Sequence, residues 1–166
     1  TLTIKPAVGV TPTISTALAS NFMFRVNGNY VIFDGSNAVG GTTRDMTISN
    51  TSATNPSAIL YGSLNPLPVV GGTIKNTIFL NGANGTSNVV VGGSASTTSA
   101  ATDGYCNNFT FQNNSSRFTN HGIYMTLVVG TANGSGTLIT GNDFAGTAGN
   151  AIKQSGITLI GVDGAT

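Results

Sequence analysis

Charged side chains are scarce in this chain of 166 residues: Asp, Glu, Lys and Arg together make up 7%, against about 25% in an ordinary soluble domain. The formal net charge of +1 provides no basic surface for nucleic acid or for anionic lipid. Low net charge combined with 39% hydrophobic residues also argues against intrinsic disorder. The composition therefore excludes nucleic acid as a partner and predicts a folded domain.

Cysteine is nearly absent as well, and its single copy, Cys106, excludes an internal disulfide framework. We expect this thiol to be buried and unreactive at the start of a strand. No apolar run approaches the ~20 residues that span a membrane, and no signal peptide precedes the first strand-like residues. Membrane insertion is therefore not expected, and we interpret residues 1–166 as a single domain that is a segment of a longer chain or a processed product.

In place of charge the chain has Thr, Ser, Asn and 23 Gly. All four are mediocre helix formers, and no stretch of a dozen residues has a helical period. Short apolar runs end instead in Asn or Gly, as in Phe109-Thr110-Phe111, Ile123-Tyr124-Met125 and Leu138-Ile139-Thr140. Short strands that recur about every 20–30 residues predict the stacked coils of a β-solenoid. We therefore predict an all-β fold, a right-handed parallel β-helix with essentially no α-helix.

Two sets of strands alternate in this prediction. The first face is centred on Ile32, Ile48, Ile78, Phe109, Leu138 and Leu159. The second face is centred on Ile59, Val90, Tyr124 and Ile152. Asn residues at the strand ends are expected to stack as hydrogen-bonded ladders between coils. Asn and Gly are also expected at the corners, because they tolerate the left-handed conformation.

A family resemblance supports the same fold. The segments concerned read NFTFQNNSS, HGIYMTL, GTLITGNDF and GNAIKQS, and they resemble the right-handed parallel β-helix repeat of pectate-lyase-like proteins. The front half, with LTIKPAVGVTPTIS, FRVNGNYVIFDGSN and TTRDMTISNTS, looks like the start of such helices in large secreted or cell-surface proteins of Bacteroidetes-type bacteria. The resemblance covers nearly the whole chain. It implies a secreted location, and because this fold hosts lyases, hydrolases, adhesins and phage fibres it implies no single activity.

Acidic residues are the first place to search for chemistry, because polysaccharide-cleaving enzymes use clustered carboxylates. The five acids are Asp34, Asp45, Asp103, Asp143 and Asp163. Asp143 and Asp163 both follow predicted first-face strands, so they are expected to approach each other one coil apart. Most of the five stand beside Gly or Asn, where Asp forms turns, and the turn role is favoured over catalysis. Arg44 and Asp45 are interpreted as a local ion pair or as charges that protect a strand from edge pairing, not as a catalytic couple.

Besides Asp143 and Asp163, the remaining candidate for catalysis is His121. It is the only histidine of the chain, and it precedes a strand. No Ser or Asp stands at a diagnostic spacing from it, so we favour a solvated or hydrogen-bonded turn histidine. Tyr61 and Tyr105 are candidates for exposed tyrosines that stack on sugars, and packing within the fold is the alternative use of these rings. The loops at residues 94–103 and 130–136 are the places where recognition is expected. No cofactor or metal site is predicted, since the regular Gly-Gly-x-Gly-x-Asp calcium pattern is absent.

These observations favour a non-catalytic structural or adhesive module of a secreted or cell-surface bacterial protein, in contact with glycans through its loops. Its expected partners are the rest of a parent polypeptide or neighbouring solenoid coils, and polysaccharide. One alternative is a carbohydrate-active enzyme, a polysaccharide lyase or glycoside hydrolase, or a fragment of one. A second alternative is an ice-binding solenoid, which needs a flat array of Thr-x-Thr; only the segments at Thr1–Thr3 and Thr11–Thr13 fit that pattern.

Overall fold

A computed structural model describes residues 1–64, 66–85, 88–92, 103–130, 133–147 and 149–166, with the backbone alone for 88–92. The described residues form strands, turns and loops and contain no helix, so none that could cross a membrane. Most of the predicted loop at residues 94–103 lies outside the described residues, as do two positions of the loop at 130–136. The all-β prediction is confirmed.

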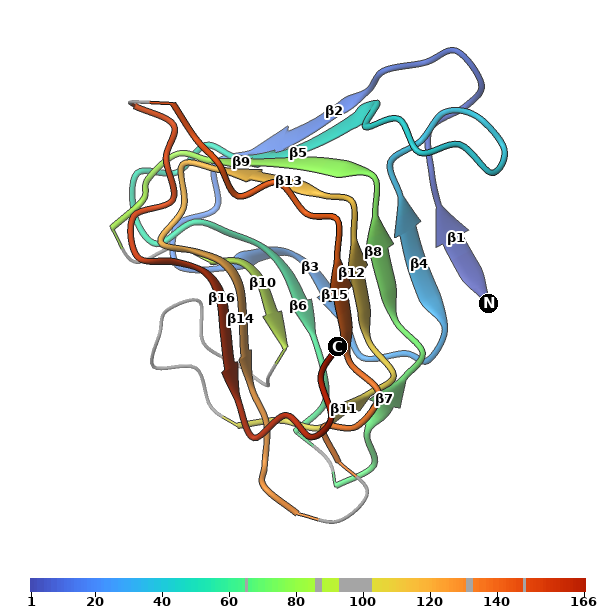
Figure 1. The fold of residues 1–166 in the computed structure, drawn as a ribbon. Coiled ribbons are helices and arrows are strands. Elements are labelled where there is room, and N and C mark those ends of the chain that lie inside the picture. Colours follow the sequence, from blue (N-terminus) through green and yellow to red (C-terminus); the bar gives the residue numbers. More distant parts are fainter. Residues whose placement is uncertain (65, 86–87, 93–102, 131–132, 148) are drawn as a thin grey trace.

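Every strand pair in the three main sheets is parallel, and the chain passes through the sheets in turn (Figure 1). Sheet A contains β1 (Leu2–Ile4), β4 (Val31–Asp34), β8 (Thr73–Lys75), β12 (Thr110–Gln112) and β15 (Leu138–Thr140). Sheet B contains β2 (Thr13–Thr16), β5 (Met46–Asn50), β9 (Thr77–Asn81) and β13 (Ser115–Arg117). Sheet C contains β3 (Phe22–Val26), β6 (Ser57–Tyr61), β10 (Asn88–Gly92), β14 (His121–Thr126) and β16 (Ser155–Ile160). A short pair, β7 (Val69–Val70) with β11 (Cys106–Asn107), lies between sheets C and A.

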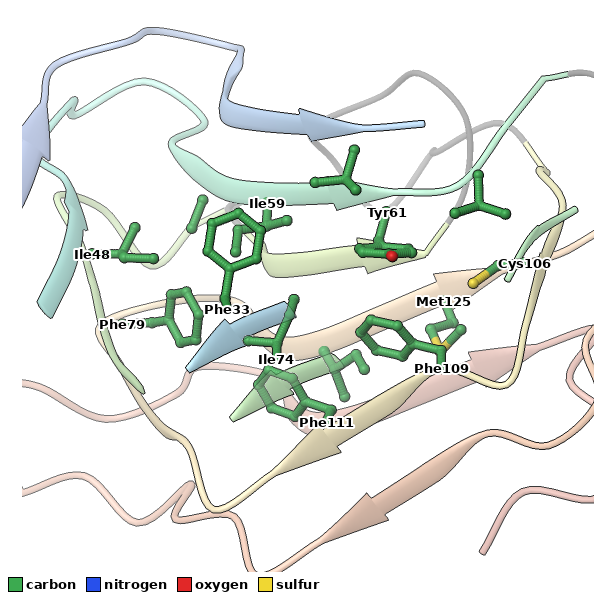
Figure 2. Packing of buried hydrophobic residues seen from close by; sticks show 14 of the residues in the cluster. Phe33, Ile48, Ile59, Tyr61, Ile74, Phe79, Cys106, Phe109, Phe111 and Met125 are labelled. Atoms are coloured by element: carbon green, nitrogen blue, oxygen red, sulfur yellow. The ribbon is translucent and has the colours of Figure 1, made fainter. Parts of the chain in front are cut away.

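The core consists of columns of apolar side chains from successive coils. In sheet A the registered inward row is Ile4, Phe33, Ile74, Phe111 and Ile139. Figure 2 shows Ile59, Ile74 and Phe79, one from each sheet, pointing into the same interior. The Phe79 and Phe111 rings stack with centroids 6.2 Å apart. Each coil therefore buries its apolar side chains against its neighbours, as a solenoid requires.

The predicted assignment of strands to faces is only partly right, because the solenoid has three main faces rather than two. Ile48 and Ile78 belong to sheet B, and Leu159 belongs to sheet C, not to the face that contains Ile32 and Leu138. For Ile78 the error arises at the corner between sheets A and B. There β8 and β9 are separated by the single residue Asn76, so the sequence reads as one continuous strand.

The second predicted face is largely confirmed as sheet C. Val90 pairs with Ile59 on one side and with Ile123 on the other, so the prediction at Tyr124 is one residue out of register. Ile152 lies outside any strand, and β16 begins at Ser155 instead.

The corners between sheets A and B use the residue types that the sequence predicts. Asn76, Asn113 and Gly141 occupy equivalent positions with φ of 56°, 50° and 63°. The main-chain N–H of Asn76 donates to Gln112 O, and that of Asn113 donates to Thr140 O. A left-handed residue reverses the chain in one step, which explains why Asn and Gly recur here.

The asparagine ladders are also confirmed. Asn113 Nδ2 donates to Asn76 Oδ1 at 2.8 Å, and Asn114 Nδ2 donates to Asn142 Oδ1 at 3.2 Å. Asn120 Nδ2 donates to Gln154 Oε1 at 3.1 Å at another corner. Side-chain amides suit this role because each both donates and accepts.

Candidate functional site

Asp143 lies where side chains from three coils meet, on the outside of the corner between sheets A and B. It forms an isolated parallel bridge with Ser115 directly after β15. The Arg117 guanidinium in β13 donates to the Asp143 carboxylate and, at 2.9 Å, to its main-chain carbonyl. Arg44 NH1 lies 3.6 Å from the same carboxylate oxygen. The Arg117 hydrogen bond, helped by the Ala145 N–H and the Arg44 charge, holds the Asp143 pKa below its usual value.

Arg44 reaches this carboxylate from the loop between β4 and β5. Its Nε donates to Asn113 O at 2.9 Å, and its NH2 donates to Asn113 Oδ1 at 3.0 Å and Gly141 O at 3.4 Å. The predicted local pair of Arg44 with Asp45 is therefore wrong. Asp45 instead accepts hydrogen bonds from Asn37 N and Thr43 Oγ1, which fold its own loop and lower its pKa.

A polar hollow of about 480 Å³ opens beside this loop. It is lined by residues from three coils: Gly40, Gly41, Thr42, Lys75, Asn76, Gln112 and Asn113. Lys75 Nζ lies 3.2 Å from Asp34 Oδ2, where it is bound in a half-buried ion pair. The pKa of Asp34 is lowered because its hydrogen bonds to Asn76, Ser36 and Lys75 outweigh the opposing effect of burial.

Asp163 does not join Asp143, so the predicted approach of these two carboxylates is wrong. Asp163 bridges Ser135 and its N–H donates to Gly134 O, in the segment after sheet C. Asp143 follows a strand of sheet A, and Asp163 follows a strand of sheet C. Residues that follow strands of different sheets lie at different corners of the coil, which separates them.

His121 is the first residue of β14 and is 2% exposed, so it is neither solvated nor in a turn. Of the two predicted states, the hydrogen-bonded one is confirmed. Its Nδ1 lies 2.7 Å from Ser155 Oγ and 3.2 Å from Thr158 Oγ1, and these two hydroxyls are 2.6 Å apart. Its Nε2 is buried and has no hydrogen-bond partner among the residues that the structure describes. Burial lowers the His121 pKa, which favours the neutral ring.

The His121, Ser155 and Thr158 cluster is the arrangement that sequence reasoning missed. Ser155 pairs with His121 in register, one coil further along sheet C. Comparing HGIYMT at residues 121–126 with SGITLI at 155–160 would have placed these side chains together. Within the described residues no carboxylate is hydrogen-bonded to the ring. The cluster therefore lacks the acid that orients histidine in a nucleophilic triad.

The two tyrosines proposed for sugar stacking differ from each other. Tyr61 is 0% exposed, so its predicted exposure is wrong. Its ring packs on Phe109 with centroids 5.2 Å apart, and burial raises its pKa to about 12. Tyr105 is half-buried and pairs through its backbone with Ser63, so a role in stacking on sugars stays a prediction for this residue alone.

Metal-binding and reactive groups are the remaining candidates. Across the described ranges, no three His, Cys, Asp or Glu side chains converge as they would to hold a metal ion. Cys106 is buried, as expected, and burial raises its pKa to about 12. A thiol with such a pKa is protonated at neutral pH and is a poor nucleophile.

In comparisons with known proteins, no family model, no curated protein and no solved structure matches the chain.

Proposed function

We propose that this chain is a non-catalytic structural or adhesive β-solenoid module. The observation that carries the proposal is that its few charged side chains form ion pairs between coils. Asp34 is bound to Lys75 in the next coil, and Asp143 is bound by Arg117 and Arg44 from two others. These ion pairs tie different coils of the solenoid together, and Asp34 and Asp143 belong to separate pairs.

The direction of the pKa shifts supports the same role. Glycoside hydrolysis needs one carboxyl group with a raised pKa as the acid and a second one nearby. Asp34, Asp45 and Asp143 all have lowered pKa values, each because hydrogen bonds stabilise the carboxylate. A carboxylate so stabilised is a poor proton donor at neutral pH.

The setting that we propose is a secreted or cell-surface bacterial protein of the pectate-lyase-like β-helix type. Support for it comes from the residue resemblance and from the neutral surface rich in Thr, Ser and Asn. The partners that we propose are neighbouring coils and polysaccharide. β1, β2 and β3 each pair on one side only within the described residues, so further coils could extend all three sheets.

Catalysis on polysaccharide is the competing function, and a turnover assay separates the two. Incubation with a panel of neutral and acidic polysaccharides, with reducing ends and unsaturated products followed, is expected to give no turnover. The control variants are Asp143→Ala and Asp163→Ala, since Asp163 is exposed and lies away from the arginines. Robust turnover that Asp143→Ala abolishes and Asp163→Ala leaves intact would overturn the structural role.

Ice binding has less support from the arrangement of threonines. The two Thr-x-Thr segments do not form one array, because Thr3 lies in sheet A and Thr13 lies in sheet B. In sheet A the outward row that contains Thr3, Thr73 and Thr110 is interrupted by Ile32 and ends at Leu138. Thermal hysteresis in solution would revive this alternative.

A further inference from the structure

We propose that the polar hollow beside the loop at residues 40–44 is a binding site for an uncharged saccharide. The inference rests on the adhesive role proposed above and assigns it to a place that the sequence did not indicate. The hollow is about 480 Å³, within the range of about 300–1,000 Å³ that is usual for small-molecule sites.

The wall of the hollow is held in place before any ligand arrives. Asn76 Nδ2 donates to Gly41 O at 3.2 Å, and Asn113 Nδ2 donates to Thr42 O at 2.7 Å. Both asparagines belong to the ladder at the corner, so the loop is fixed to the most regular part of the solenoid. Arg44 also donates hydrogen bonds to Asn113, one of the residues that line the hollow. A preformed wall lowers the entropy cost of binding.

The groups left to face a ligand are neutral or already paired. Gln112 and Thr42 are exposed, and within the described part of the chain no hydrogen bond uses the Gln112 carboxamide or the Thr42 hydroxyl. Lys75 contributes an ammonium group whose charge is balanced by Asp34 at 3.2 Å. Arg44 lies 3.6 Å from the Asp143 carboxylate, which it shares with Arg117.

This chemistry selects the ligand class. Carboxamide, hydroxyl and ammonium groups offer both donors and acceptors, and sugar hydroxyls also donate and accept. An anionic ligand would have to compete with Asp34 for Lys75, which disfavours a uronate or a phosphate. Lys75 and Gln112 pair in register across adjacent strands of sheet A, about 5 Å apart, so a chain of sugars could contact successive coils.

The test is an NMR titration of the 15N-labelled protein with neutral oligosaccharides, and in parallel with uronate oligosaccharides. We expect neutral sugars to shift the backbone amide signals of Gly40, Gly41 and Thr42 and the side-chain amide signals of Gln112. Gln112→Ala and Thr42→Val are each expected to weaken binding about three- to tenfold, the loss of one uncharged hydrogen bond. Thr13→Val, on the exposed outer side of sheet B, is the matched control and should leave the affinity unchanged.

Three results would overturn the inference: no shift with any neutral sugar, shifts that cluster away from the hollow, or tighter and salt-sensitive binding of uronates. Circular dichroism of each variant distinguishes loss of binding from loss of folding. The polysaccharide turnover assay has an independent readout. Absence of binding together with absence of turnover would therefore reject the saccharide site and leave the structural role in place.

Discussion

Removal of the Asn114 side chain is the sharpest test of how the coils are held together. Asn114 is 0% exposed and connects three successive coils. Its Oδ1 accepts from Thr77 N at 3.0 Å, and its Nδ2 donates to Ile74 O at 2.8 Å and to Asn142 Oδ1 at 3.2 Å. Asn114→Ala therefore removes the partners of two buried main-chain groups in the preceding coil.

The expected cost follows from those two groups. A buried donor or acceptor left without its partner costs about 1–3 kcal/mol, so the two groups together should lower the free energy of unfolding of Asn114→Ala by about 2–6 kcal/mol. That is a large share of the roughly 5–15 kcal/mol by which a native domain is stable. Urea denaturation followed by circular dichroism measures the change. Asn27→Ala, at an exposed asparagine directly after β3, is the matched control and should cost less than about 0.5 kcal/mol.

A double-mutant cycle then tests whether the asparagines act as a ladder. Asn142 Oδ1 accepts both from Asn114 Nδ2 and from Asn114 N at 2.8 Å. The effects of Asn114→Ala and Asn142→Ala should therefore be non-additive by about 0.5–3 kcal/mol. A cost for Asn114→Ala no larger than that of Asn27→Ala, or strict additivity with Asn142→Ala, would refute the reasoning.

Three further predictions follow from single buried positions. Burial lowers the His121 pKa in the folded state, so the unfolded chain takes up its proton first and stability should fall as pH drops below about 6.5. His121→Gln should flatten the dependence of Tm on pH between about 7 and 5, and an unchanged slope would contradict this. Cys106, with its pKa raised to about 12, should resist iodoacetamide in the native protein and react after unfolding in urea; rapid native labelling would contradict its burial. A Cβ at Gly35 would lie 2.0 Å from Asn76 O, so Gly35→Ala should cost about 1–3 kcal/mol or more in urea denaturation. Gly28→Ala, where the nearest atom is 3.9 Å away, should cost less than half as much, and equal costs would refute the clash.

Strands and corner residues could be predicted from the sequence because both depend on local chemistry. Alternating apolar residues mark the inward columns, and Asn or Gly marks the left-handed corners. The number of faces could not be predicted in the same way. A corner of one residue, such as Asn76, leaves no gap in the apolar pattern, so β8 and β9 read as one strand.

The candidate sites depended on register between coils, and this explains why they were predicted less well. Asp143 was identified as a candidate, yet its partners Arg117 and Arg44 come from other coils and were not foreseen. Ser155 stands opposite His121 only once HGIYMT and SGITLI are placed in adjacent strands. Loops of variable length hide this spacing, so no fixed interval in the sequence indicates it.

Register in this solenoid is specified at the corners more than in the strands. A slip of one residue would turn every inward side chain outward, and strands of three residues such as β8, β12 and β15 bury few apolar groups to prevent it. The corner supplies what such short strands lack. Asn76 and Asn113 can share a hydrogen bond only when their left-handed residues are stacked, and Asn114 can bond to Ile74 O, Thr77 N and Asn142 only in that same alignment. Amide pairs do this without net charge, which is why a chain with 7% charged residues can hold its coils in a single register.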